Sequence, residues 1–397
     1  MKLVMIIPDG AADEPVAALA GRTPLEAADT PNMDAIARAG RIGRVVTIPP
    51  GMAAGTDVGS MSLFGYDPVT CHTGRAPIEA LARGLSPGPD ELIFRCNFVT
   101  ILDGRMRDFT AGHIEQDEAD WLIRDLNNHF GDEAVIFHPG VSYRNLMTMR
   151  GAGDFQCSFM PPHEIPDAPV ADHGPKGPGA DRISELLRRG AEVLRDHPVN
   201  AARRSAGKAP VTDIWLWGHG RSPSTETLRQ RYGLRVAVIT AVDIIRGLGI
   251  MAGADLIEVE GATGFIDTNY AGKGEAAVKA LNDYDLTFVH VEAPDEAGHL
   301  GDAAMKTEAI EQVDKHVVGP VLAALRSRND WRLMVAPDHP TPINTRAHSS
   351  VPPPFCYCGS DVEPNGADRF DENAAAQGPL IDPGHQLLAM FLGKQAP

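Results

Sequence analysis

Short apolar segments alternate with amphipathic segments along much of the chain, and this alternation constrains the fold more than any other feature. The apolar segments have the length of strands that are buried on both faces, and the amphipathic segments have helical spacing. Strands and helices in alternation predict an α/β fold with a mostly parallel sheet flanked by helices. The expected strands are residues 3–7, 44–48, 213–217, 235–240, 286–291 and 332–336, and the expected helices are residues 30–40, 241–253, 273–284 and 307–328.

The middle of the chain has a different pattern, which indicates a second domain. From about residue 77 to 175, strand-like segments follow one another through turns, without alternating helices. Residues 160–180 are rich in proline and glycine and suit a linker. We therefore expect a discontinuous core of residues 1–76 and 181–397, interrupted by a smaller α+β domain of residues 77–180. A chain of 397 residues is long enough for two cores.

Composition excludes several classes of protein. The formal net charge of −17 repels polyphosphate backbones and anionic lipids, so neither nucleic acid nor a membrane is an expected partner. No apolar run is long enough to span a bilayer, and the N-terminal apolar run ends in Pro8-Asp9-Gly10 rather than a cleavage site. We expect a cytoplasmic protein whose first strand lies at the N-terminus. The five cysteines are odd in number and scattered, which argues against a disulfide framework, and nothing indicates an oligomeric state.

Carboxylates and imidazoles that suit divalent metals occur near both ends of the chain. Asp295 and His299 are four residues apart and would share one face of a helical turn. Asp338 and His339 directly follow an apolar run, where a strand end would place them at a cleft. One catalytic zinc usually takes three protein ligands, so six candidates fit two metals that share a substrate better. The six candidates are Asp9, Asp295, His299, Asp338, His339 and His348.

A glycine-rich segment, residues 51–68, carries the candidate nucleophiles. Glycine lets backbone N–H groups approach an anion closely, and a hydroxyl held against a divalent metal can attack phosphorus. Three hydroxyl residues of this segment, Thr56, Ser60 and Ser62, have suitable positions. The local spacing alone does not choose among them.

These residues resemble motifs of a known family over nearly the full length of the chain. The chain resembles the alkaline-phosphatase superfamily and, within it, the archaeal-type cofactor-independent phosphoglycerate mutases. The matching motifs are Asp9-Gly10, Gly55-Thr56-Asp57, Phe64-Gly65-Tyr66-Asp67-Pro68, Thr73-Gly74-Arg75-Ala76-Pro77 and Phe94-Arg95-Cys96-Asn97. The resemblance implies an alkaline-phosphatase-like core, and it implies Thr56 as the nucleophile where the mutases usually have serine.

The resemblance also implies how the metals are held. One metal would be bound by Asp9, Thr56, Asp338 and His339, and the other by Asp295, His299 and His348. The expected ions are two divalent metals, with manganese favoured over magnesium, cobalt or zinc, and 2,3-bisphosphoglycerate is not required. Lys273 resembles a lysine of the broader mutase family that faces the transferred phosphate.

Three arginines are candidates for the substrate anions, because a guanidinium fork binds carboxylate and phosphate bidentately. They are Arg75, Arg144 and Arg221; surface salt bridges are the alternative for Arg144 and Arg221. His113 ends the segment 108–113 and is either a general acid or base or a turn histidine. That segment resembles a bacterial subgroup of the family, some members of which have been proposed to be homoserine kinases.

The predicted function is the interconversion of 3-phosphoglycerate and 2-phosphoglycerate through a phosphothreonine enzyme, a step of glycolysis and gluconeogenesis. Phosphoryl transfer to another small hydroxyl compound, with homoserine and a nucleotide as the named pair, is one alternative, although no nucleotide-binding loop is present. A metal-dependent phosphomonoesterase or sulfatase-like hydrolase is a second alternative. A non-catalytic metal-binding scaffold is a third.

Overall fold

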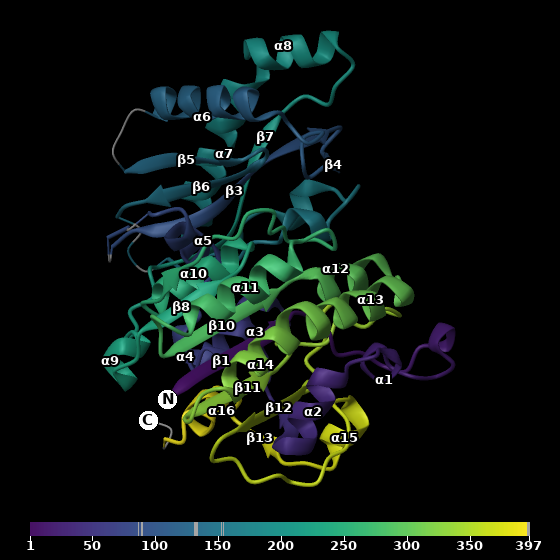
Figure 1. Cartoon of the computed structure of the whole chain (residues 1–397). Helices are drawn as coiled ribbons and strands as arrows, with labels where there is room; N and C mark the ends of the chain where they lie inside the picture. The colour runs from purple at the N-terminus through teal and green to yellow at the C-terminus, as the bar shows by residue number, and fades with distance from the viewer. Residues whose placement is uncertain (86, 89, 131–133, 152, 154, 395–397) are drawn as a thin grey trace. The chain divides into compact units, whose positions relative to one another are not determined.

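The computed structural model describes residues 1–85, 87, 88, 90–130, 134–151, 153 and 155–394. The chain divides into two compact units (Figure 1). We call residues Met1–His72 with Ser224–Pro397 the discontinuous unit, and residues Thr73–Pro223 the inserted unit. Each unit contains its own sheet.

The discontinuous unit is built on an eight-stranded sheet in the order β13-β2-β12-β11-β1-β10-β8-β9. Neighbouring strands are parallel except where β12 pairs with β11 and with β2. This arrangement confirms the expected α/β fold with a mostly parallel sheet. The strands are β1 (Lys2–Pro8), β2 (Arg41–Val45), β8 (Val236–Ile239), β9 (Asp255–Leu256), β10 (Leu286–Val291), β11 (Trp331–Val335), β12 (Pro354–Gly359) and β13 (Leu380–Ile381).

Both faces of this sheet are buried by helices, as expected for apolar parallel strands. On one face, Val4 and Ile6 of β1 belong to a core cluster with residues of α2, α11 and α13. Residues alternate between faces along a strand, and Phe288 of β10 stacks on Phe64 after α3, with ring centroids 4.0 Å apart. The helices are α1 (Pro24–Ala27), α2 (Pro31–Ala39), α3 (Thr56–Leu63), α4 (Pro68–Cys71), α9 (Leu228–Tyr232), α10 (Asp243–Met251), α11 (Tyr270–Ala280), α12 (Ala293–Leu300), α13 (Ala303–Val313), α14 (Gly319–Arg326), α15 (Glu372–Ala376) and α16 (Gln386–Phe391), with a 3-10 turn η1 (Ala17–Leu19).

One expected helix is interrupted in the structure, and another has an unusual cap. The helix expected over residues 307–328 is divided into α13, a π-helical segment η4 (Asp314–Val318) and α14. Thr30 occupies the N-cap position of α2, but its side chain makes no capping hydrogen bond. The Asp314 carboxylate of η4 accepts hydrogen bonds from the backbone N–H groups of Asn32 and Met33 instead, at 3.2 and 2.7 Å. A side chain remote in sequence therefore caps this helix.

The inserted unit contains a second sheet in which β4, β3, β6 and β5 are consecutive neighbours and β7 also pairs with β3. Its core cluster includes residues of β3, α6, β6, α7 and β7. The strands are β3 (Leu92–Leu102), β4 (Arg105–Asp108), β5 (Val135–Val141), β6 (Arg144–Met149) and β7 (Asp213–Gly220); the helices are α5 (Arg75–Ala82), α6 (Gln116–Phe130), α7 (Ala180–Arg195) and α8 (Pro198–Ser205), with 3-10 turns η2 (Pro162–Glu164) and η3 (Val170–His173).

The inserted unit extends further along the chain than the sequence pattern indicated. Residues 181–223 were expected in the discontinuous core, and residues 213–217 were expected as one of its strands. The structure places both in the inserted unit, because β7 pairs antiparallel with β3 along Ile93 to Val99. A short apolar strand does not reveal which sheet it joins, since the ladder partners lie far away in sequence.

Among the described residues, none of the helices combines the length and apolar character that a membrane span requires.

Candidate metal centre

The carboxyl ends of three neighbouring parallel strands carry the candidate ligands. β1 lies between β10 and β11, so the residues that follow these strands meet at one edge of the sheet (Figure 1). Asp9 follows β1 directly, and Asp338 lies three residues after the end of β11. Helix α12 starts two residues after β10 and carries Asp295 and His299 one turn apart. The sheet order therefore explains why residues from both ends of the chain converge.

One group of ligand atoms comes from Asp9, Asp338 and His339, all fully buried. The Nε2 atom of His339 lies 3.3 Å from Asp9 Oδ1 and 3.7 Å from Asp338 Oδ2. The hydroxyl of Thr56, the first residue of α3, lies 3.3 Å from the same Nε2 atom. This set could hold one divalent ion with the threonine hydroxyl beside it.

A second group consists of Asp295, His299 and His348. The Nε2 atoms of the two histidines are 2.9 Å apart, and they lie 3.2 and 3.5 Å from the oxygens of Asp295. The rings of His348 and His339 have centroids 4.3 Å apart, so this group lies beside the first. The six residues proposed as ligands from the sequence are therefore brought together within one unit.

His290 and Glu292 form a third group with Asp9, and the sequence analysis missed both residues. His290 Nε2 lies 2.8 Å from Asp9 Oδ2 and 3.6 Å from Glu292 Oε2. A signal was available, because both residues stand at the end of the apolar segment 286–291 and just before Asp295. In the sheet, His290 is the direct neighbour of Ile7, two residues before Asp9.

The three hydroxyl candidates have different surroundings. The Ser62 hydroxyl donates a hydrogen bond to the Thr47 carbonyl at 2.6 Å, which commits it to the backbone. The Ser60 hydroxyl donates to Asp338 Oδ2 at 2.9 Å. Thr56 lies at the start of α3, where unpaired N–H groups favour negative charge. The surroundings of Thr56 are therefore better suited to an anionic phosphoryl group than those of Ser62.

Burial and charge crowding shift the pKa values of these groups strongly. Burial, together with the charges of Asp338 and Glu292, raises the pKa of Asp9 well above its usual value. Burial raises the pKa of Glu292 to about 8 and lowers that of His290 to about 3. Burial also lowers the pKa of His339. The crowded carboxylates and neutral imidazoles are the state that a bound cation would favour.

Asp295 and His299 behave as an ion pair in the second group. Burial opposes ionisation of Asp295, but hydrogen bonds from His299 and His348 outweigh it and hold the pKa of Asp295 well below its usual value. The hydrogen bond between His299 and Asp295 also raises the pKa of His299 to about 9. Asp295 and His299 therefore stabilise each other's charged forms.

Two buried carboxylate oxygens of the donor set bear on its fit to a divalent metal. Among the described residues, Asp9 Oδ1 and Glu292 Oε2 are buried without a hydrogen-bond partner. A buried carboxylate oxygen without a donor is costly unless an ion satisfies it. Carboxylate oxygens mixed with imidazole nitrogens suit manganese, zinc, cobalt or magnesium. The residues present therefore fit divalent metals.

Lys273 lies in the same unit, on α11, and is fully buried. Its Nζ donates a hydrogen bond to the His290 carbonyl at 3.1 Å, which places the amine at the end of β10. Burial lowers the pKa of Lys273 to about 8. A lysine in this position can carry positive charge close to Asp9 and its partners.

The three arginines and His113 belong to the inserted unit. Arg75 pairs with Glu79 at 3.2 Å, Arg144 stacks over the Tyr143 ring, and Arg221 donates to the Gly153 carbonyl at 3.0 Å. His113 is exposed and has a left-handed backbone conformation, with φ 48°. The discontinuous unit thus contains the metal-ligand candidates together with Thr56 and Lys273. The inserted unit contains the three arginines and His113.

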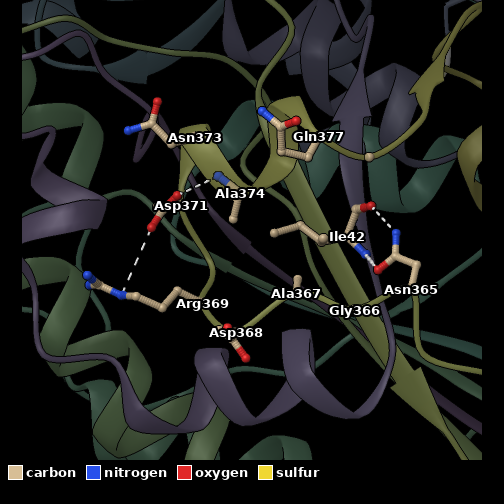
Figure 2. Close-up of a pocket in the computed structure, with 11 residues that line it drawn as sticks. Ile42, Asn365, Gly366, Ala367, Asp368, Arg369, Asp371, Asn373, Ala374 and Gln377 are labelled. Carbon is tan, nitrogen blue, oxygen red and sulfur yellow. Dashed lines mark hydrogen bonds and ion pairs between the residues drawn. The ribbon is translucent and has the colours of Figure 1, made fainter.

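A separate pocket of about 360 Å³ lies beside α15 and contains none of these residues (Figure 2). Asn365 pairs with both backbone groups of Ile42 in its wall, and the Asp371 carboxylate accepts from the N–H of Ala374. Arg369 lies 4.0 Å from Asp371. The polar groups of this wall that Figure 2 joins by dashed lines satisfy one another.

The fold and the residues at the strand ends define an α/β protein with side chains that could hold divalent metals beside a hydroxyl at a helix N-terminus. Residues 37–200 match the model of a family described as 2,3-bisphosphoglycerate-independent phosphoglycerate mutase. A protein of that name from Methanothrix thermoacetophila is 48% identical over 95% of this chain and 96% of its own length. A probable mutase of the same kind from Geobacter sulfurreducens is 44% identical over 99% of this chain and 100% of its own length.

The solved structure of a protein from Pyrococcus horikoshii has the same fold, with a TM-score of 0.83 and 31% identity over 99% of this chain and 96% of its own. The chain therefore belongs to the family of 2,3-bisphosphoglycerate-independent phosphoglycerate mutases.

Proposed function

We propose that the protein interconverts 3-phosphoglycerate and 2-phosphoglycerate through a phosphothreonine at Thr56, with two divalent metals and without 2,3-bisphosphoglycerate. The observation that carries this proposal is the pair of adjacent ligand groups, one of which lies beside the Thr56 hydroxyl, in a chain of this family. Mutase relatives that cover nearly the whole chain support the choice of substrate.

In this proposal Asp9, Asp338 and His339 hold one metal beside Thr56, and Asp295, His299 and His348 hold the other. Manganese is the expected ion. When bound, the metals supply positive charge that lowers the pKa of the attacking hydroxyl and stabilises the charge on the transferring oxygens.

The chain's own residues carry out the transfer. Thr56 Oγ1 attacks the phosphorus of 3-phosphoglycerate and loses its proton, while the bond between phosphorus and the 3-oxygen breaks and the 3-oxygen takes up a proton. Glycerate then reorients, and its 2-hydroxyl loses its proton and attacks the phosphothreonine. The bond between phosphorus and Thr56 Oγ1 breaks, and Oγ1 takes up a proton. Lys273 contributes positive charge next to the phosphoryl group. We propose Arg75, Arg144 and Arg221 as the groups that bind the substrate anions and His113 as a general acid or base.

A coupled assay tests this proposal. Purified protein loaded with Mn²⁺ is given 3-phosphoglycerate without 2,3-bisphosphoglycerate; enolase reports 2-phosphoglycerate, and free phosphate is followed in the same sample. We expect 2-phosphoglycerate with little free phosphate. Thr56→Ala should lose activity by a factor of about 10⁴ or more and form no phosphoenzyme, while Thr56→Ser should keep both.

The outcomes separate the alternatives. Free phosphate as the main product would contradict the mutase proposal and identify a phosphomonoesterase. No turnover by folded, Mn²⁺-loaded protein would also contradict it, and homoserine with ATP would be the next substrate pair. A fully active Thr56→Ala variant would exclude Thr56 as the nucleophile and direct attention to Ser60.

A further inference from the structure

Thr341 lies between the two ligand groups and contacts both. It follows Asp338, His339 and Pro340 and is fully buried. Its hydroxyl donates a short hydrogen bond to Asp295 Oδ1, and the same oxygen lies 3.3 Å from His339 Nδ1. One side chain therefore touches a proposed ligand of each metal.

The single proton of this hydroxyl fixes the direction of both hydrogen bonds. Because the proton goes to Asp295, the oxygen must accept from His339, so Nδ1 of His339 carries the hydrogen. The Pro340 carbonyl, which can only accept, lies 3.3 Å from the same Nδ1 atom. Both neighbours favour this tautomer, and the lone pair of Nε2 is left free toward Asp9 and Thr56.

A buried ion pair holds the backbone of Thr341 in place. The amine of Lys306, fully buried on α13, donates to the Thr341 carbonyl at 2.8 Å, the Ala12 carbonyl at 3.2 Å and the Asp13 carboxylate at 2.7 Å. Asp13 also accepts from the N–H of Ile343 at 3.2 Å. Lys306 and Asp13 thereby join the loop after β1 to the loop after β11.

Two glycines let these loops approach Thr341 closely. A Cβ atom on Gly10 would lie 2.6 Å from Thr341 Oγ1 and 2.5 Å from Asp295 Oδ1, and Gly10 has a positive φ of 60°. A Cβ atom on Gly298 would lie 2.5 Å from the Thr341 carbonyl. Thr341 is therefore closely approached from the loop after β1 and from α12.

We infer that Thr341 is a positioning residue that couples the two metal groups, orienting Asp295 of one and His339 of the other, and that Lys306 holds it there. The inference rests on the proposed function only in requiring that these groups bind metal. Partners that orient metal ligands typically change metal affinity about 10- to 100-fold when they are removed.

Calorimetric titration of the metal-free protein with Mn²⁺ tests the inference. Thr341→Ala removes the hydroxyl and the methyl group, and Thr341→Ser removes only the methyl group, so their difference isolates the hydroxyl. We expect about tenfold or greater loss of Mn²⁺ affinity in Thr341→Ala and affinity within about threefold of the parent protein in Thr341→Ser. Thr30→Ala is a matched control, because Thr30 has a buried hydroxyl without a hydrogen-bond partner among the described residues.

Circular dichroism and melting temperature accompany each titration. Loss of Mn²⁺ affinity in folded Thr341→Ala, restored in Thr341→Ser and absent in Thr30→Ala, supports the inference. Parent-like affinity in folded Thr341→Ala, or equal losses in the alanine and serine variants, would overturn it. If Thr341→Ala does not fold, the isosteric Thr341→Val replaces it in the same comparison.

The titration also separates this inference from the mutase proposal. Hydroxyl-dependent Mn²⁺ binding by a protein that does not convert 3-phosphoglycerate would support the positioning role and contradict the substrate. If the protein converts 3-phosphoglycerate but its Mn²⁺ affinity does not depend on the Thr341 hydroxyl, the mutase proposal is supported and the positioning role of Thr341 is contradicted.

Discussion

At the scale of the residue, Glu372 illustrates how the fold shifts the pKa of a carboxyl group that is not a candidate metal ligand. Its Oε1 accepts from the N–H of Asp13 at 3.0 Å and its Oε2 accepts from the Thr23 hydroxyl at 2.6 Å. Burial nevertheless raises the pKa of Glu372 to about 7. The carboxyl group is therefore protonated in the folded protein over a pH range in which it is ionised in the unfolded chain.

This difference predicts a pH-dependent stability. The folded state holds one more proton between the unfolded pKa, about 4.5, and the folded pKa, about 7, so the stabilisation present below pH 4.5 is lost as the pH rises through 7. The loss is at most about 3 kcal/mol. Glu372→Gln keeps an acceptor for Asp13 and cannot ionise, so it should gain stability over the parent protein as the pH rises from 5 to 8.

Urea unfolding of both proteins at pH 5, 6, 7 and 8 measures this gain. Glu363→Gln, at an exposed position of the same unit, is the control and should not change how the unfolding free energy depends on pH. A difference between Glu372→Gln and the parent protein that stays constant across the series would show that Glu372 has an ordinary pKa.

At the scale of the element, α11 and the π-helical segment η4 are packed closely at Gly274, the residue after Lys273. A Cβ atom on Gly274 would collide with the His316 carbonyl oxygen of η4. π-Helical turns are rare and occur mostly as single turns inside α-helices, frequently at functional sites. Gly274 and η4 together let α11 carry Lys273 to the end of β10.

Gly274→Ala should therefore separate α11 from η4. We expect a loss of about 1–3 kcal/mol in unfolding free energy, despite the higher helix propensity of alanine, and a further loss of activity because Lys273 moves. Urea unfolding and the mutase assay check both parts. Glu275→Ala, the next residue and exposed on the same helix, should change stability by less than about 0.5 kcal/mol. Equal stability of Gly274→Ala and the parent protein would contradict the packing argument.

The local hydrophobic pattern of the sequence predicted where strands lie better than it predicted which strands pair. The apolar runs at 3–7, 286–291 and 332–336 became β1, β10 and β11, since burial on both faces leaves a clear signal. The run at 213–217 also became a strand, but its partner β3 could not be read from its own residues. The π-helical turn of η4 leaves no such periodic signal, because its apolar residues remain compatible with an ordinary helix.

The candidate site was predictable for a related reason. Asp295 and His299 were recognisable by their spacing, and Asp338 by its place after an apolar run. Thr341 and Lys306 were not recognisable, because their roles depend on hydrogen bonds to Asp295, Asp13 and two carbonyls that only the folded chain brings near. Residue type and spacing identify ligands, while the groups that orient them emerge from tertiary contacts.

At the scale of the whole molecule, the candidate metal centre lies in one of two units, and it concentrates negative charge in a chain that is already strongly acidic. The formal net charge is −17, and Asp9, Glu292, Asp295 and Asp338 converge within the discontinuous unit. Divalent ions would relieve repulsion that the folded state otherwise has to bear. Their binding should therefore stabilise the discontinuous unit and leave the inserted unit nearly unchanged.

Mn²⁺ should raise the melting temperature of metal-free protein by about 5–10 °C at a concentration 100 times its dissociation constant, because such binding contributes about 2.7 kcal/mol. Hydrogen exchange should slow in residues 9–13, 292–299 and 338–348, and much less in residues 73–223. Asp338→Asn should lose most of the effect, while Asp283→Asn, an exposed acid of the same unit, should keep it. Equal slowing in both units would mean that Mn²⁺ acts on the overall charge of the protein rather than at the strand ends.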